Sequence, residues 1–278
     1  MTVTSGEHWI ETQRGKLFAK VWLPSNKMRP EEAFLLFHDS LGCVDLWRDF
    51  PEKLAHATQR PVVAYDRLGF GKSDPYPGLL PPHFIRDEAE TSIPQLRKQL
   101  GLGILIPFGH SVGGGMAVAT AARHQDICKA LVTESAQAFV EDRTLEGIRA
   151  AKVAFQEPGQ IERLERYHGS KARWVLDAWI ETWLAPAFEN WSLEEDLKQV
   201  RCPVLAIHGD LDEFGSELHP ERIARLTPGP VEPVVLSACG HVPHREQPDR
   251  VLGELMHFLR QSGLRAEQSP SMTHTVSP

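Results

Sequence analysis

The sequence predicts an α/β fold in which helices cover both faces of a mostly parallel sheet. Short apolar runs alternate with segments of helical periodicity along most of the 278 residues. A Gly-x-Ser-x-Gly pattern at residues 109–113 stands where the apolar run 104–108 passes into a run of small residues. Between residues 138 and 200 the periodicity is helical throughout, which indicates a helical insertion into the alternating pattern.

The first part of the chain opens with two strands joined by an Arg14-Gly15 turn. A helix is expected over residues 45–58, because Leu46, Phe50 and Leu54 share one helical face. Residues 66–82 are dense in Gly and Pro and are interpreted as a loop. Up to the serine motif, the predicted strands are 8–12, 17–23, 33–38, 61–65 and 104–108, and the predicted helices are 45–58 and 83–100.

After the motif, the sequence predicts a helix over 113–122 and a strand over 127–133. Strand character returns at 203–208 and 231–236, with helices at 220–226 and 248–260. We therefore expect a core formed by residues 1–136 and 201–262, a helical cap at 137–200 and a disordered tail at 263–278. A dinucleotide-binding fold would need Gly-x-Gly-x-x-Gly after the first strand, and that pattern is missing there.

Composition narrows the range of partners. The net charge is −7 and no basic block occurs, so nucleic acid is not expected as a partner. No apolar run approaches 18 residues, and residues 1–7 lack the pattern of a signal peptide. The four scattered cysteines include no Cys-x-x-Cys and are interpreted as reduced thiols. We expect a cytoplasmic protein that acts on a small molecule without a membrane partner; its oligomeric state is not predicted.

Ser111 is the predicted nucleophile. A strand that turns sharply into a helix holds the residue at the turn in a strained conformation and exposes its hydroxyl, and small neighbours make that turn possible. The helix that follows begins at the site, where its partial positive charge favours a developing anion. A turn serine with no chemical role is the alternative.

A serine hydroxyl needs a base, which is expected to be a histidine held by a carboxylate. His241 is the preferred base because it follows the final strand and precedes the last helix. His244 is the rival. A metal bound by His241 and His244 is not expected, since no third ligand cluster is evident in the sequence.

Three carboxylates are candidates for the acid. Asp210 and Asp212 both follow the strand at 203–208, and Asp212 is preferred because Asp210 resembles a turn residue beside Gly209. Glu134, after the strand that follows the nucleophile helix, is the third option, with a helix cap or an ion pair as its alternative role. The resulting order along the chain is serine, aspartate, histidine.

An oxyanion needs preorganised donors. The Val112 backbone N–H at the helix start is one expected donor, and the Ser40 N–H in the loop 38–42 is the other, with Leu41 as the alternative. We expect Leu41, His110, Trp179 and Trp183 to contact substrate. Trp179 and Trp183 are four residues apart on one helix face, so packing of the cap onto the core is their alternative role.

These residues resemble the α/β-hydrolase superfamily over nearly all of residues 6–260. Residues 109–113 look like its nucleophile elbow, and 38–42 look like its oxyanion loop, with Asp39 in place of the usual Gly. Residues 66–73 are similar to its Asp-x-x-Gly-x-Gly-x-Ser loop, 209–212 to its acid turn and 240–248 to its histidine loop. The resemblance implies an eight-stranded sheet, a helical cap between strands six and seven, and hydrolysis through a covalent intermediate without a cofactor.

The sequence alone leaves three functions open. The preferred one is a serine hydrolase that cleaves a carboxylic ester. A carbon–carbon bond hydrolase of a ring-cleavage product is the first alternative, and an arginine in the pocket would favour it, with Arg67, Arg86 and Arg149 as candidates. A binder of small molecules without catalysis is the second alternative.

Overall fold

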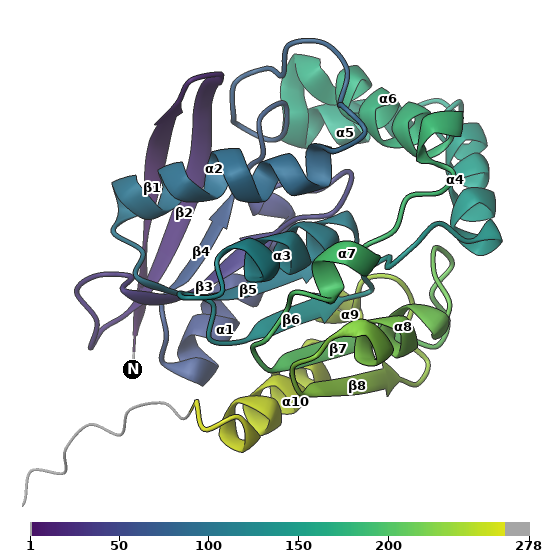
Figure 1. Cartoon of the computed structure of the whole chain (residues 1–278). Coiled ribbons are helices and arrows are strands. Elements are labelled where there is room, and N and C mark those ends of the chain that lie inside the picture. Colours follow the sequence, from purple (N-terminus) through teal and green to yellow (C-terminus); the bar gives the residue numbers. More distant parts are fainter. Residues whose placement is uncertain (1, 265–278) are drawn as a thin grey trace, which may run out of the picture.

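Eight strands form a single sheet in residues 2–264, the part of the chain that the computed structural model describes. Their bounds are β1 Val3–Thr12, β2 Gly15–Pro24, β3 Glu32–Phe37, β4 Val62–Tyr65, β5 Ile104–His110, β6 Leu131–Glu134, β7 Val204–Gly209 and β8 Val231–Leu236. The order across the sheet is β1-β2-β4-β3-β5-β6-β7-β8 (Figure 1). β2 is antiparallel to β1 and to β4, and all other neighbours are parallel. The predicted fold class is confirmed.

Strand alternation divides the core into two layers. In β3, Leu35 and Phe37 face one layer, whereas Phe34 and Leu36 face the other, as a period of two requires. Because both faces are buried, the parallel strands are almost continuously apolar. The first layer is covered by α2 Phe84–Leu100, α3 Val112–Arg123 and α8 Leu218–Leu226, and the second by α1 Phe50–Thr58 and α10 Pro248–Gln261.

The prediction of one continuous helix over residues 45–58 is wrong, because the structure divides this segment into two helices. A 3-10 helix, η1 Val44–Trp47, is followed by a break at Arg48, whose φ is 53°. α1 then begins, with Pro51 in its first turn. Proline has no N–H to donate and is favoured in the first turn of a helix, which agrees with a new helix that begins here.

The N-terminal strand is longer than predicted. β1 pairs with β2 over its whole length, from Val3 opposite Pro24 to Thr12 opposite Gly15. Most of its residues are exposed, so the hydrophobic alternation that marks a strand is weak there. At the other end, α10 ends at Gln261, and the predicted disordered tail falls almost entirely on residues 265–278, outside the described part. Within residues 2–264, no helix is both long and apolar enough to cross a membrane.

Residues 137–200, which we call the cap segment, are helical between β6 and β7. The elements are α4 Asp142–Ala154, α5 Gln160–His168, η2 Gly169–Lys171, α6 Ala172–Trp183, η3 Pro186–Phe188 and α7 Glu194–Leu197. Figure 1 shows α4, α5 and α6 grouped beyond one edge of the sheet. His168 Nε2 donates to Leu41 O (2.9 Å) and Thr144 Oγ1 donates to Phe214 O (2.7 Å). The cap segment is thereby attached to loops that follow β3 and β7; its status as a separate domain stays a prediction.

Candidate active site

The turn between β5 and α3 holds Ser111 in a strained backbone conformation, with φ 56° and ψ −125°. Such a conformation is costly for a residue with a side chain and persists only where its surroundings enforce it. A Cβ on Gly109 would lie 2.1 Å from Gly113 O, and one on Gly113 would lie 2.2 Å from Phe37 O. Both glycines are therefore required by close backbone approach. The Ser111 N–H donates to Glu134 O (2.9 Å), which fixes the turn against β6.

The structure brings Ser111, His241 and Asp212 together from three loops. Ser111 Oγ lies 3.0 Å from His241 Nε2, and His241 Nδ1 lies 2.8 and 2.9 Å from the two carboxylate oxygens of Asp212. Asp212 follows β7 and His241 follows β8, so the parallel sheet delivers all three to the carboxyl edge. The arrangement suits transfer of the serine proton to an imidazole whose cation a carboxylate stabilises.

Burial and charge act in opposite directions on the aspartate–histidine pair. Burial favours the neutral form of Asp212, but the hydrogen bond and charge of His241 outweigh it and lower the Asp212 pKa. For His241, burial again favours the neutral form, and the hydrogen bond and charge of Asp212 outweigh it and raise the His241 pKa. The pair therefore favours a carboxylate beside an imidazole that accepts a proton readily.

The competing candidates occupy other positions. Asp210 Oδ1 accepts the Cys239 N–H (3.2 Å), as a turn residue would. Glu134 Oε2 lies 2.5 Å from His244 Nδ1, and both side chains are buried and are not among the hydrogen-bond partners of the Ser111 hydroxyl. Burial favours the neutral form of Glu134, but the charge of His244 outweighs it and lowers the Glu134 pKa.

His110 is placed differently from the sequence expectation that it contacts substrate. Its side chain is 3% exposed, and its Nε2 lies 2.7 Å from His241 O. Its ring packs against the rings of His241 and His244, with centroids 5.1 and 5.0 Å apart. The His110 side chain therefore contacts residues 241 and 244 of the histidine loop and is not among the described residues that line the cavity at Ser111.

One cluster has metal-ligating side chains. Potential ligand atoms of His110, Glu134 and His244 lie within 4.8 Å of one another, a grouping that the sequence pattern did not indicate and that does not include His241. Glu134 Oε2 bonds to His244 Nδ1 and His110 Nε2 bonds to the His241 carbonyl, whereas the buried Glu134 Oε1 has no hydrogen-bond partner among residues 2–264. The donor set therefore serves to connect β5, β6 and the histidine loop.

Hydrogen bonds to its backbone carbonyl groups hold the loop at residues 38–42 in place. Asp39 O accepts from Arg67 Nη2 (2.8 Å) and from His38 Nδ1 (2.8 Å), and Leu41 O accepts from His168. Ser40 and Leu41 line the cavity at Ser111, and Val112 is the first residue of α3. The roles of the Ser40 and Val112 N–H groups as oxyanion donors stay predictions.

A cavity of about 260 Å³ opens at Ser111 beneath the cap segment. Trp179 and Trp183 are among its lining residues, and Trp183 also packs against Phe188 and Trp191. Their contact with substrate stays a prediction. Most of the lining surface is apolar, and the charged residues are Asp39 and Glu213, with no Lys or Arg among the described lining residues. The full lining is Asp39, Ser40, Leu41, Ser111, Gln137, Thr144, Ile148, Ala151, Phe155, Trp179, Trp183, Glu213, Phe214, His241 and Val242.

Gln137 is a site residue that the sequence analysis missed. Ser111 Oγ lies 3.3 Å from Gln137 Oε1, and the Gln137 side chain is 4% exposed. Glutamine is not a typical acid, base or nucleophile, so its residue type gave no signal. Its position three residues after the end of β6, at the same sheet edge as the nucleophile, is the only indication that the sequence offers.

Comparisons with known proteins agree with the fold. A family model described as "alpha/beta hydrolase fold" matches residues 32–169. The chain is 31% identical over 115 residues to a (lyso)-N-acylphosphatidylethanolamine lipase of Bos taurus, a match that covers 41% of this chain and 33% of the lipase. It is 26% identical over 211 residues to the serine hydrolase BPHL of Mus musculus, covering 72% of this chain and 69% of that protein. The structure of a proline iminopeptidase from Mycobacterium smegmatis superimposes with a TM-score of 0.69 at 19% identity, covering 93% of this chain and 99% of that one.

Proposed function

Because this chain belongs to the α/β-hydrolase superfamily, we propose that it is a serine hydrolase. The substrate is a carboxylic ester, or a related acyl compound, of a small and partly apolar molecule. The observation that carries the proposal is the continuous path from Ser111 Oγ through the His241 ring to Asp212, with contacts of 2.8–3.0 Å. A site that only binds a ligand has no need for such a path.

In the proposed mechanism, His241 takes the Ser111 proton as the hydroxyl oxygen attacks the carbonyl carbon. The tetrahedral oxyanion is held by backbone N–H groups of Ser40 and Val112, at the start of α3. His241 then protonates the leaving alcohol, which leaves an acyl group on Ser111. A water molecule, deprotonated by His241, hydrolyses that acyl-enzyme. No cofactor enters these steps.

The cavity favours an ester over the carbon–carbon bond of an anionic ring-cleavage product. A carboxylate on the substrate would need a cationic partner, and the described lining contains none. Arg86 pairs with Asp196 at 2.8 Å, Arg67 lines a different cavity, and Arg149 is exposed on α4. The apolar walls of Phe155, Trp179 and Phe214 suit an uncharged acyl or aryl group.

The test is turnover of a panel of nitrophenyl esters beside a dienoate diketone, by the parent chain and by Ser111→Ala. We expect ester hydrolysis by the parent, none by the variant, and no diketone cleavage. Circular dichroism and thermal unfolding check that Ser111→Ala stays folded. Ester turnover that survives in Ser111→Ala would contradict the proposal, and diketone cleavage by the parent would favour the carbon–carbon hydrolase.

A further inference from the structure

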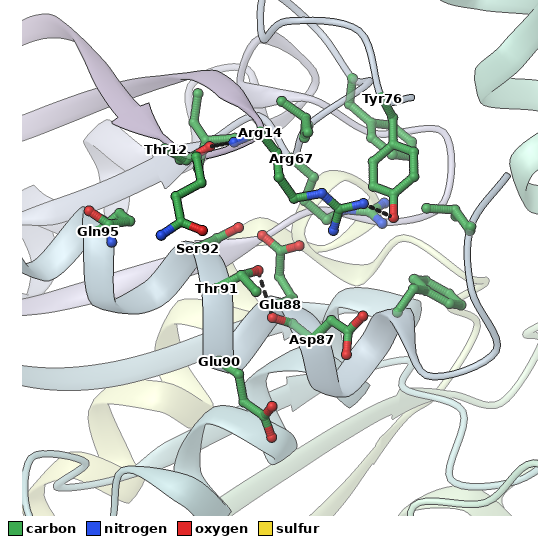
Figure 2. Close-up of a pocket in the computed structure, with 16 residues that line it drawn as sticks. Thr12, Arg14, Arg67, Tyr76, Asp87, Glu88, Glu90, Thr91, Ser92 and Gln95 are labelled. Atoms are coloured by element: carbon green, nitrogen blue, oxygen red, sulfur yellow. Dashed lines mark hydrogen bonds between the residues drawn. The ribbon is translucent and has the colours of Figure 1, made fainter. Parts of the chain in front are cut away.

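A second cavity, of about 210 Å³, lies away from Ser111 and shares no lining residue with the active-site cavity. It lies between the β1–β2 turn, the loop that follows β4, and α2 (Figure 2). A single buried water needs only about 10–15 Å³ of such space, so the cavity has room for a small organic molecule. Its described lining is Thr12, Gln13, Arg14, Leu17, Arg67, Leu68, Phe70, Tyr76, Leu80, Phe84, Asp87, Glu88, Glu90, Thr91, Ser92 and Gln95.

Arg67 supplies a buried positive charge to this cavity. It is 3% exposed, and its guanidinium bonds to His38 and to Asp39 O and lies over the Phe70 ring, with 4.0 Å between Cζ and the ring centroid. Within residues 2–264, no carboxylate forms an ion pair with it. The carboxylates of Glu88 and Asp39 act on this guanidinium only from beyond ion-pair distance, so an anion bound directly to it would be stabilised.

Glu88 supplies the opposite charge across the same cavity. Its Oε1 accepts the Tyr65 hydroxyl at 2.8 Å, and the described part of the chain gives its carboxylate no cationic partner within ion-pair distance. Other acidic residues of α2 are already paired, Asp87 with His83 and Glu90 with Arg123. Arg67 and Glu88 thus line one cavity as opposite charges that make no direct ion pair.

The positive and negative side chains of the lining lie on different sides of the cavity. Figure 2 shows Arg14 and Arg67 on the side formed by the β1–β2 turn and the β4 loop, with Asp87 and Glu88 on the α2 side. Arg14 is oriented by its bond to the Tyr76 hydroxyl (2.5 Å). The apolar side chains of Leu17, Leu68, Leu80 and Phe84 share the rest of the wall with uncharged polar residues, which are Thr12, Gln13, Thr91, Ser92 and Gln95.

We propose that this cavity binds a small zwitterion of the α-amino acid class with an aliphatic side chain. The carboxylate pairs with Arg67 and Arg14, the ammonium pairs with Glu88, and the side chain packs against the leucines and Phe84. Charge-assisted hydrogen bonds at both ends supply the affinity and reject molecules that carry one charge. The assignment of this site does not rest on the proposed hydrolase reaction, although Arg67 also bonds to Asp39 O in the loop at residues 38–42.

Binding is measured by isothermal titration calorimetry on the full chain carrying Ser111→Ala, so that no probe is turned over. The probes are L-leucine, L-leucinamide, which lacks the carboxylate, and N-acetyl-L-leucine, which lacks the ammonium. We expect saturable binding of one L-leucine and at least about tenfold weaker binding of each analogue. Absence of saturable L-leucine binding, or equal binding of either analogue, would overturn the proposal.

Variants locate the site. Glu88→Gln keeps an acceptor for the Tyr65 hydroxyl and removes the charge, so L-leucine affinity should fall at least about tenfold. Glu52→Gln, an exposed change on α1, and Trp179→Ala, in the active-site cavity, should leave it unchanged. Parent-like affinity in Glu88→Gln, or a loss in Trp179→Ala, would contradict the assignment. The analogue series needs no variant at this site, so it stands even if Glu88→Gln folds poorly.

Discussion

Replacing Asp212 with asparagine removes the charge that faces His241 and retains the shape of the side chain. In the proposed mechanism the imidazolium exists only as the serine proton is transferred, so the whole attraction acts on the barrier. At the observed 2.8 Å and an effective dielectric constant of about 20, that attraction is about 6 kcal/mol. Each 1.36 kcal/mol is a factor of about ten in rate, which sets an upper limit of roughly 10⁴. The amide dipole retains part of the interaction, so we expect kcat/KM to fall about 10³- to 10⁴-fold.

The pH profile provides a second readout of Asp212→Asn. The charge of Asp212 raises the pKa of His241, and only neutral His241 accepts the serine proton, so kcat/KM falls as the pH drops through that pKa. Without the charge, the acidic limb should move to lower pH.

The assay is stopped-flow or steady-state hydrolysis of a nitrophenyl ester across pH, with Asp210→Asn as the matched control. Asp210 contacts the Cys239 N–H and does not contact His241, so its rate should stay close to the parent rate. The reasoning is refuted if Asp212→Asn keeps kcat/KM within tenfold of the parent, or if Asp210→Asn is the more damaging change.

Three further predictions concern the turn, the buried pair and the cavity wall. Gly113→Ala should lower the free energy of unfolding by about 2 kcal/mol or more, because the added Cβ would lie 2.2 Å from a backbone carbonyl oxygen. The control is Gly253→Ala, where no atom lies within 4 Å of the added Cβ, and it should raise the free energy of unfolding by up to about 1 kcal/mol. Equal urea midpoints for the two variants would contradict this. Glu134→Gln should cost about 3 kcal/mol near neutral pH by breaking the buried pair with His244. The folded pKa of Glu134 lies below the usual 4.5, so its stabilisation is present above 4.5 and is lost as the pH falls through the folded value; a difference in Tm that stays constant down to about pH 3 would argue against it. Trp179→Ala should enlarge the cavity and shift the preference among nitrophenyl esters toward longer acyl chains, which a chain-length series of kcat/KM values would detect or exclude.

The Ser111 turn was predictable because its requirements are local in sequence. Two glycines, a preceding apolar run and a following run of small residues are all visible within twenty residues, and the structure gives a steric reason for both glycines. The preference for Asp212 over Asp210 also rested on local turn chemistry. Parallel strands then bring the loops that follow them to one edge, so the grouping of Ser111, Asp212 and His241 follows from fold class.

Other features depend on contacts between distant segments and left no local signal. The orientation of His110 is set by the His241 carbonyl, 131 residues away. Glu134, at the end of β6, pairs with His244, which lies 110 residues later in the chain. This contact depends on how the histidine loop packs against β6. The length of β1 is set by pairing with β2, because its own side chains are mostly exposed.

The central claim is that His241 activates the hydroxyl group of Ser111 as a nucleophile. Labelling of the native chain with a fluorophosphonate, followed by peptide mass spectrometry, tests it most directly. The account predicts one adduct on Ser111, lost in Ser111→Ala and strongly slowed in a folded His241→Ala variant. A native chain that stays unlabelled, or an adduct on any other serine, would contradict it.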